Sequence, residues 1–405
     1  MAHNRLLGRV GGQTALLFWP LFLTLVLSFG LGTAAHRMMF YLMSPCLFIG
    51  LWYARTACIQ VMKTPLFYGI AAYIGYFAIS IAWSPAPAPY DIFRAGVDMA
   101  CILVFLCALA VWLGQAAYRP DILRATVMGI AAVTLIYAGF YYGLEGHGIS
   151  ERLWGYGRYN NPIHLSAALA LALLTWFATL ERPLTRRMFS ITAGVVSLLV
   201  IIILLSQTRS TLVAMSGAAC VTIVLGYRRA GLAIIGSVAI CMGLTYLAWG
   251  NSLAELVARG DTYRLAIWAE ALDIIRQSPA IGHGLLFDPQ FLLNKPTGPY
   301  EAVHNIILGH AVHGGLIAVL LMLGLGLRAG YVAIRVFLDT QNGDLQSTKD
   351  HKVALLSILL LGFGFIFSQF TSSHFVEGLN SQWLVFWMPV GLCLYLEMRR
   401  NEIRG

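Results

Sequence analysis

The run VHNIILGHAVHGGLIAVLLMLGLGLR, residues 303–328, decides what kind of protein this chain encodes. It holds no acidic residue, and its one Lys or Arg side chain is Arg328 at the very end. A helix rises about 1.5 Å per residue, so a helix of this length exceeds the roughly 30 Å hydrocarbon core of a bilayer. We therefore predict a transmembrane helix, with His304 and Asn305 at one polar boundary.

Comparable apolar runs recur along the rest of the chain. Stretches long enough to span a membrane, roughly 17–25 residues each, occur at 14–33, 38–54, 65–83, 95–116, 122–142, 162–180, 188–206, 211–227, 231–249, 303–328, 353–372 and 382–398. The first has the length of a full span rather than of the shorter core of a signal peptide. The fold class we predict is an all-α polytopic membrane protein of about 12 transmembrane helices, with residues 1–405 as a single integral membrane domain.

The composition supports this class and indicates the orientation. Hydrophobic residues make up 59% of the chain and charged residues 11%, against about 25% charged in soluble domains. The net charge of +9 does not indicate nucleic-acid binding, because the basic residues lie in short loops between spans instead of on one water-facing surface. Most of the 27 Lys and Arg residues fall on one side if the N-terminus is cytoplasmic, so we predict both termini in the cytoplasm.

The longest polar interruption is residues 250–302, which form a large loop on the outer side in this topology. Within it, Thr262–Gln277 has helical spacing, with Asp261 or Thr262 as N-cap and Pro279 just beyond the end. The apolar side chains that recur on one face of this predicted helix are Leu265, Trp268, Leu272 and Ile275, with Arg264 at the border. Such an amphipathic helix lies in the membrane interface or packs over the bundle as a cover.

A second cation on the outer side, Arg209, lies in the short turn Ser206–Thr211 between two predicted spans. One interpretation is snorkelling, in which a long arginine side chain near a helix end reaches the lipid headgroups. The neighbouring hydroxyl and amide side chains favour a second interpretation, anion binding, because the forked guanidinium group suits a phosphate or pyrophosphate.

The histidines of the span at 303–328 are separated by helix geometry. His304 and His313 are nine residues apart, which on a regular helix places them about 180° apart around the axis and about 13 Å apart along it. His304 falls at the outer boundary, whereas His313 and His310 lie deeper and are expected to face the bundle interior and form hydrogen bonds there. Depth therefore favours His304 as the reactive histidine. His283, between two glycines, is predicted to be exposed.

These features occur in an order that resembles the O-antigen ligase family (WaaL type), which also includes polysaccharide polymerases and protein O-oligosaccharyltransferases. The features that carry the resemblance are the short-turn arginine Arg209, an Arg-x-x-x-Trp helix with Arg264 and Trp268, the following Pro279 and Gly282-x-Gly284, and the pair His304-Asn305 that enters a span. Ligases of this family continue from His-Asn through nine residues to Gly and, after two more residues, to Gly, Thr or Val. Gly315 fits this motif, whereas Ala318 departs from its last position with another small residue.

The resemblance implies a glycosyltransferase-C-like architecture and a bacterial inner-membrane enzyme with its active site in the periplasm, where residues 250–302 form the large periplasmic loop. Such an enzyme moves O-antigen polysaccharide from undecaprenyl pyrophosphate to lipid A-core, with inversion and without a metal or other cofactor. The outer segments agree, since they contain no Asp-x-Asp or Glu-x-Asp sequence, and magnesium prefers oxygen ligands.

The roles that follow are hypotheses. Neutral His304 would accept the proton of the acceptor hydroxyl, while Arg209 and Arg264 would stabilise the negative charge on the departing pyrophosphate. The substrate contacts that we predict beside them are Arg259, Arg158, Asn305 and His313. The choice of His304 over His313 as the base depends on the depth argument alone.

Two alternatives stay open. A polysaccharide polymerase of the same superfamily would use the same chemistry with a second lipid-linked glycan as acceptor. A multi-span transporter, from a different class, is expected to bury ionisable side chains near the middle of spans or to show interrupted helices in matching halves. Apart from His310 and His313 no ionisable side chain lies near the centre of a predicted span, and no internal repeat is evident. The glycan, the acceptor sugar and the oligomeric state are not predicted.

Overall fold

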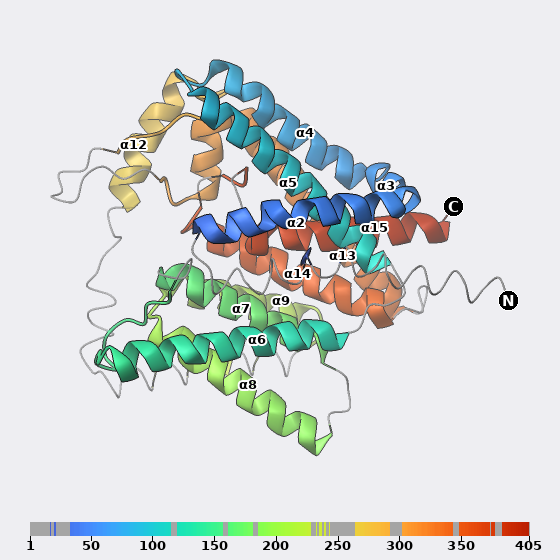
Figure 1. The fold of residues 1–405 in the computed structure, drawn as a ribbon, viewed down its shortest axis with the longest axis vertical. Coiled ribbons are helices and arrows are strands. Elements are labelled where there is room, and N and C mark those ends of the chain that lie inside the picture. Colours follow the sequence, from blue (N-terminus) through green and yellow to red (C-terminus); the bar gives the residue numbers. More distant parts are fainter. Residues whose placement is uncertain are drawn as a thin grey trace.

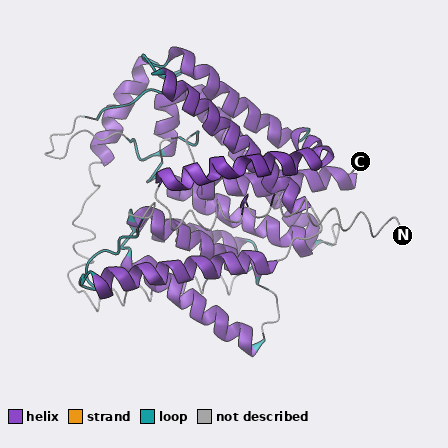
Figure 2. Cartoon of the chain, viewed as in Figure 1, coloured by secondary structure: helices purple, strands orange, loops and turns teal. Residues whose placement is uncertain are grey.

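The computed structural model describes residues 33–114, 120–156, 161–180, 185–227, 264–291, 302–342, 348–372, 374–376 and 383–404, with isolated positions within 17–21 and 232–243. Every regular element in these ranges is a helix (Figure 2). The elements are α2 (Thr33–Tyr53), α3 (Arg55–Met62), α4 (Pro65–Ser80), η1 (Ile81–Trp83), α5 (Pro89–Gly114), α6 (Pro120–Ala138), η2 (Gly139–Leu144), α7 (Pro162–Thr179), α8 (Arg186–Leu205), α9 (Arg209–Val224), α12 (Arg264–Gln277), α13 (Ile306–Gln341), α14 (Thr348–Ser368), η4 (Trp383–Trp387) and α15 (Met388–Arg404).

Seven described helical segments are long and apolar enough to cross a membrane: α4 with η1, α5, α6 from Thr126 on with η2, α7, α8, α13 and α14. Residues 37–62 of α2 and α3 pass the same test together, but the chain bends by 91° between these two helices. α9 is apolar and shorter. The described residues thus form helices only, several of them long and apolar enough to span a membrane, in agreement with the predicted polytopic membrane protein. The predicted spans at 14–33 and 231–249 lie almost wholly outside the described residues, so the total of twelve stays a prediction.

Helices α13, α14 and α15 form a central layer of the bundle (Figure 1). α13 packs against α4 and α15 packs against α5, whereas α14 packs against α7 and α9. The layer therefore joins two groups of helices, α2–α5 and α6–α9, and one continuous apolar core extends through both. In Figure 1, α12 and the C-terminal end of α6 lie on the left and the C-terminus of the chain lies on the right, so α12 and the end of α6 belong to the same end of the bundle.

Helix starts follow from local sequence chemistry. The side chain of Thr64 caps α4 by accepting the Phe67 N–H, and Asn161 caps α7 by accepting the Ile163 N–H. Each cap is followed by proline at the first helical position, Pro65 or Pro162, where the missing N–H costs nothing. These starts were readable from the sequence because they depend on neighbouring residues only.

The helix predicted at Thr262–Gln277 is confirmed as α12, while its predicted caps lie outside the described residues. Its buried face agrees with the prediction only in part, because Trp268 and Ile275 pack against the buried cluster and the two leucines do not. Leu265 and Leu272 are 64% and 45% exposed, whereas Ile267 and Ala271 are fully buried. The reason is that α12 packs through the Ile267 side onto the start of α13, in a small apolar cluster completed by Phe291, Val303 and Val312. α12 thus packs over the bundle, one of the two placements considered, while its position relative to the membrane interface stays a prediction.

Candidate active site

Helix α13 breaks at Gly315, and the loop after α12 fills the break. Gly315 has φ 62° and ψ −164°, which no helix permits. The carbonyls of Val312 and His313 instead accept the N–H groups of His283 (2.9 Å) and Gly284 (2.7 Å). On the other side of the break, the N–H groups of residues 316 and 317 donate to the carbonyls of residues 279 and 280, at 2.9 and 3.2 Å. Irregular backbone at membrane depth is tolerated only when buried in protein in this way.

The glycines in this loop are required by close backbone contact. Gly282 and Gly284 have positive φ, +65° and +93°, which favours glycine. A Cβ on Gly282 would also lie 2.5 Å from the backbone nitrogens of Gly314 and Gly315. Tyr76 closes the joint by donating its hydroxyl proton to the carbonyl of Gly314 at 2.7 Å. The Gly-x-Gly sequence therefore fixes the position of α12 against α13.

Arg264 is the first residue of α12, and its guanidinium group lies against the chain that follows α14. It donates a hydrogen bond to the carbonyl of Phe370 at 3.2 Å. It also lies 5.9 Å from the centroid of the Phe370 ring. Trp268, one turn further on, donates its indole N–H to the carbonyl of Val303 at 3.1 Å. These contacts hold the Arg264 end of α12 next to the residue that precedes His304.

His304 lies directly before α13 and has a positive φ of 53°, unusual for a residue other than glycine. Its ring is hydrogen-bonded to the main chain of Thr371, which follows α14. Burial and, next, the positive charge of Arg264 lower the pKa of His304 below its ordinary value, while the bond to Thr371 opposes this shift. The arrangement therefore keeps His304 neutral, the form in which one ring nitrogen can accept a proton.

Asn305 is the N-cap of α13. Its side-chain oxygen accepts the N–H groups of Ile307 and Leu308, both at 3.0 Å. This capping accounts for an asparagine beside His304, because it starts the helix and leaves His304 outside it. The predicted contact of Asn305 with substrate stays a prediction.

His310 and His313 face the bundle interior and are hydrogen-bonded, as predicted. His310 is fully buried between the Tyr73 hydroxyl, 2.8 Å from Nε2, and the carbonyl of Ile306, 2.7 Å from Nδ1. His313 is 5% exposed, with Nδ1 3.3 Å from the carbonyl of Gly284. His283 was predicted to be exposed, but it is half-buried, because its ring stacks on Phe287 and Nε2 lies 2.9 Å from the carbonyl of Ile274.

Arg209 lies in the helix group α6–α9, whereas Arg264 and His304 lie at α12 and α13. It is the first residue of α9 and its side chain is exposed. The turn before it, Ser206–Thr208, is held by the loop between η2 and α7. Arg259 and Arg158, the two further predicted substrate contacts, lie outside the described residues. The structure thus brings Arg264 and His304 together and places Arg209 on a separate element.

Comparison with known proteins adds to this geometry. Residues 194–323, which include Arg209, Arg264 and His304, match the family model described as O-antigen ligase. The chain is also 26% identical over 347 residues to an O-antigen ligase from Pseudomonas aeruginosa, in an alignment that covers 83% of this chain and 79% of that protein. These matches support membership of the O-antigen ligase family. The family is one of lipopolysaccharide biosynthesis, and the apolar helices agree with a membrane enzyme.

Sequence reasoning missed one part of this candidate site. Phe370 and Thr371, which contact Arg264 and His304, belong to the segment after α14. His374 follows in the same segment, and its ring centroid lies 4.6 Å from that of His313. The available signal was the polar run Thr371–His374 at the end of a predicted span.

An apolar cavity of about 230 Å³ lies between α13, α14 and η4. Its walls are Met322, Leu323, Gly326, Leu327, Leu361, Phe365, Phe375, Val385 and Phe386. The Phe375 ring, at one side of the cavity, lies 5.4 Å from the His310 ring. Within the described ranges, no group of three or more His, Cys, Asp or Glu side chains is arranged to hold a metal ion.

Proposed function

We propose that this member of the O-antigen ligase family transfers O-antigen polysaccharide from undecaprenyl pyrophosphate to lipid A-core, at the periplasmic face of a bacterial inner membrane, with both termini in the cytoplasm. The observation that carries the proposal is the pairing of His304 with Arg264 at the start of α13. It supplies a neutral base beside a fixed cation, the two groups that such a transfer needs.

In the proposed reaction, the acceptor hydroxyl oxygen forms a bond to the anomeric carbon of the donor. The bond from that carbon to the pyrophosphate oxygen breaks, and undecaprenyl pyrophosphate leaves with the electron pair. His304 accepts the hydroxyl proton. A single displacement of this kind inverts the anomeric configuration.

Charge grows on the pyrophosphate oxygens as they depart, and the cations stabilise it. Arg264 and Arg209 do so in place of a metal ion, each with a forked set of donors that suits phosphate oxygens. Arg209 also stands at the N-terminus of α9, the positive end of the helix dipole. Arg259 and Arg158 are proposed as further substrate contacts. The apolar cavity between α13 and α14 offers a wall suited to the polyprenyl chain of the donor.

The lipopolysaccharide of a deletion strain tests the function. A ligase deletion removes all attached O-antigen, and long lipid-linked polymer accumulates. Core that carries a single repeat would instead indicate a polymerase, and counterflow of lipid-linked glycan by the purified chain would indicate a transporter. Complementation with Arg209→Lys then tests whether the forked guanidinium group of Arg209 is needed, because lysine keeps the charge and loses the fork. Loss of ligation supports anion binding by Arg209, whereas full ligation supports the snorkelling interpretation.

A further inference from the structure

The turn that carries Arg209 is short and strained. Only Ser206–Thr208 separate the end of α8 from the start of α9. Gln207 has a φ of 48°, a left-handed conformation that costs free energy for any residue other than glycine. Such a conformation persists when surrounding groups hold it, so the question is which groups do so.

Arg152, from the loop between η2 and α7, makes two bonds to this turn. Its Nε donates to the carbonyl of Ser206 at 2.8 Å, and its Nη2 donates to the hydroxyl of Thr208 at 3.4 Å. Ser206 is the C-cap of α8, where carbonyls lack helical partners and the helix dipole is negative. The Arg152 guanidinium group therefore donates to a carbonyl that lacks a helical partner and places a positive charge at the negative end of the helix dipole. Its two bonds hold the residues on either side of Gln207.

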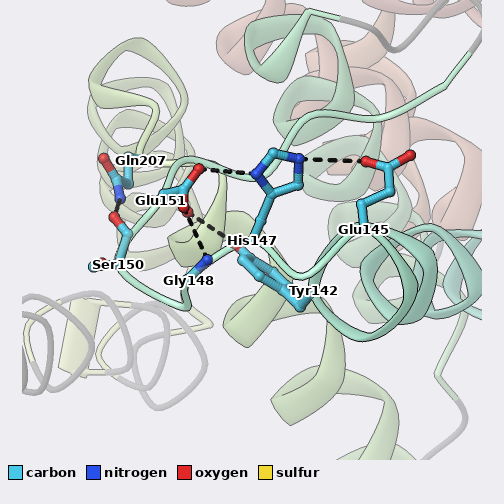
Figure 3. A network of polar contacts seen from close by, with 7 residues as sticks. All are labelled: Tyr142, Glu145, His147, Gly148, Ser150, Glu151 and Gln207. Carbon is cyan, nitrogen blue, oxygen red and sulfur yellow. Dashed lines mark hydrogen bonds and ion pairs between the residues drawn. The ribbon is translucent and has the colours of Figure 1, made fainter.

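The loop that carries Arg152, between η2 and α7, is stabilised by polar contacts of its own (Figure 3). The ring of His147 lies between two carboxylates, 3.4 Å from Glu145 and 2.9 Å from Glu151. Glu151 also accepts the N–H of Gly148 at 2.9 Å. The loop meets the turn twice more, because Gln207 donates its amide to the carbonyl of Ser150 at 3.0 Å, and the N–H of residue 153 donates to the carbonyl of residue 205 at 2.8 Å.

We propose that Arg152 is a positioning residue for Arg209: by holding the Ser206–Thr208 turn, it directs the Arg209 guanidinium group at the leaving pyrophosphate. The inference rests on the proposed function, in which Arg209 acts on that group. Arg152 is half-buried and already engaged by the turn, so it acts through Arg209 and does not itself touch substrate. A misplacement of about 1 Å at a catalytic cation can cost on the order of 100-fold in rate.

A double-mutant cycle with the purified full chain tests this. The variants are Arg152→Lys, which keeps the charge and loses the fork, Arg209→Ala, and the two combined. Transfer from undecaprenyl-pyrophosphate-linked O-antigen to lipid A-core is measured, with kcat and donor KM determined separately. Thermal unfolding of each variant is measured alongside, and Arg276→Lys, an exposed arginine near the end of α12, is the matched control expected to behave as wild type.

Arg152→Lys is expected to lower kcat by about 10- to 100-fold, with a smaller change in KM, and to have no further effect in the Arg209→Ala background. Equal fold-losses from Arg152→Lys in both backgrounds, or wild-type kcat in Arg152→Lys, would overturn the inference while leaving the role of Arg209 intact. Wild-type kcat in Arg209→Ala would instead overturn the proposed role of Arg209, and the inference with it.

Discussion

His304 and His313 are only nine residues apart, yet the fold gives them opposite surroundings. His304 stands outside α13, beyond the Asn305 cap, with the Arg264 charge beside it and its ring on the main chain of Thr371. His313 lies within α13, 5% exposed, covered by the Gly284 loop. The same contrast separates His304 from His310, which Tyr73 encloses.

The difference teaches what each histidine is able to do. A general base has to be neutral, and burial together with the Arg264 charge holds the pKa of His304 below its ordinary value. His310 and His313 use ring nitrogens to satisfy carbonyls and a hydroxyl inside the bundle, where an unpaired polar group is costly. One helix thus carries a reactive end and a structural interior. The predictions that follow test this contrast.

The largest effect is expected for His304→Ala. Loss of a general base lowers kcat by about 10²–10⁴-fold, and the protein should remain folded because the Asn305 cap and the Gly284 loop are untouched. Ligation by the purified variant, compared with wild type at equal folded concentration, measures this. Near-wild-type turnover would remove His304 from the proposed chemistry.

Gly284→Ala is expected to destabilise the loop that covers His313 and so to lower the free energy of unfolding. A Cβ there would lie 2.2 Å from Ser84 Oγ and 2.6 Å from the carbonyl of Ser80, at a φ that alanine rarely adopts. Strain and overpacking of this kind cost on the order of 3 kcal/mol. Thermal unfolding in detergent should show a clear loss, whereas Gly324→Ala, in an open part of α13, should not. Equal stability of the two variants would contradict the role given to the loop.

Tyr73→Phe should have a smaller effect, confined to stability. It removes the hydroxyl that bonds His310 and leaves a buried ring nitrogen unpaired, so the free energy of unfolding falls by about 1–3 kcal/mol. Turnover per folded molecule is expected to stay within a few-fold of wild type, because no step of the transfer involves this pair. A loss of kcat comparable to that of His304→Ala would contradict this account, because it would indicate that the buried Tyr73–His310 pair takes part in the reaction.

The sequence predicted most of the described helices because hydropathy and caps are local signals. It also predicted that His310 and His313 turn inward, since helical spacing and depth decide this. It predicted the buried face of α12 only in part, because that face depends on Phe291 and Val312, partners that only the folded chain brings together. Periodicity alone suggested that Leu265 would be buried.

The break at Gly315 and the surroundings of His304 show the same limit. A glycine pair inside an apolar run is compatible with a regular helix, and the broken form is stabilised by hydrogen bonds to the loop after α12, including those to the carbonyls of Pro279 and Ala280. Thr371 completes the site from a segment distant in sequence, which spacing rules cannot connect to His304. Arg264 was predicted as a site cation, and its contact with Phe370 is what the fold added.

The most direct test of the central claim, that His304 beside Arg264 is the base, is the pH dependence of kcat/KM in wild type and in Arg264→Gln. Activity should fall as pH drops through the pKa of His304, which burial and Arg264 hold below its ordinary value. Removing the cation raises that pKa, so the acidic limb should move to higher pH in Arg264→Gln and stay in place in Arg276→Gln. An acidic limb that is unchanged or moves to lower pH in Arg264→Gln would contradict the account.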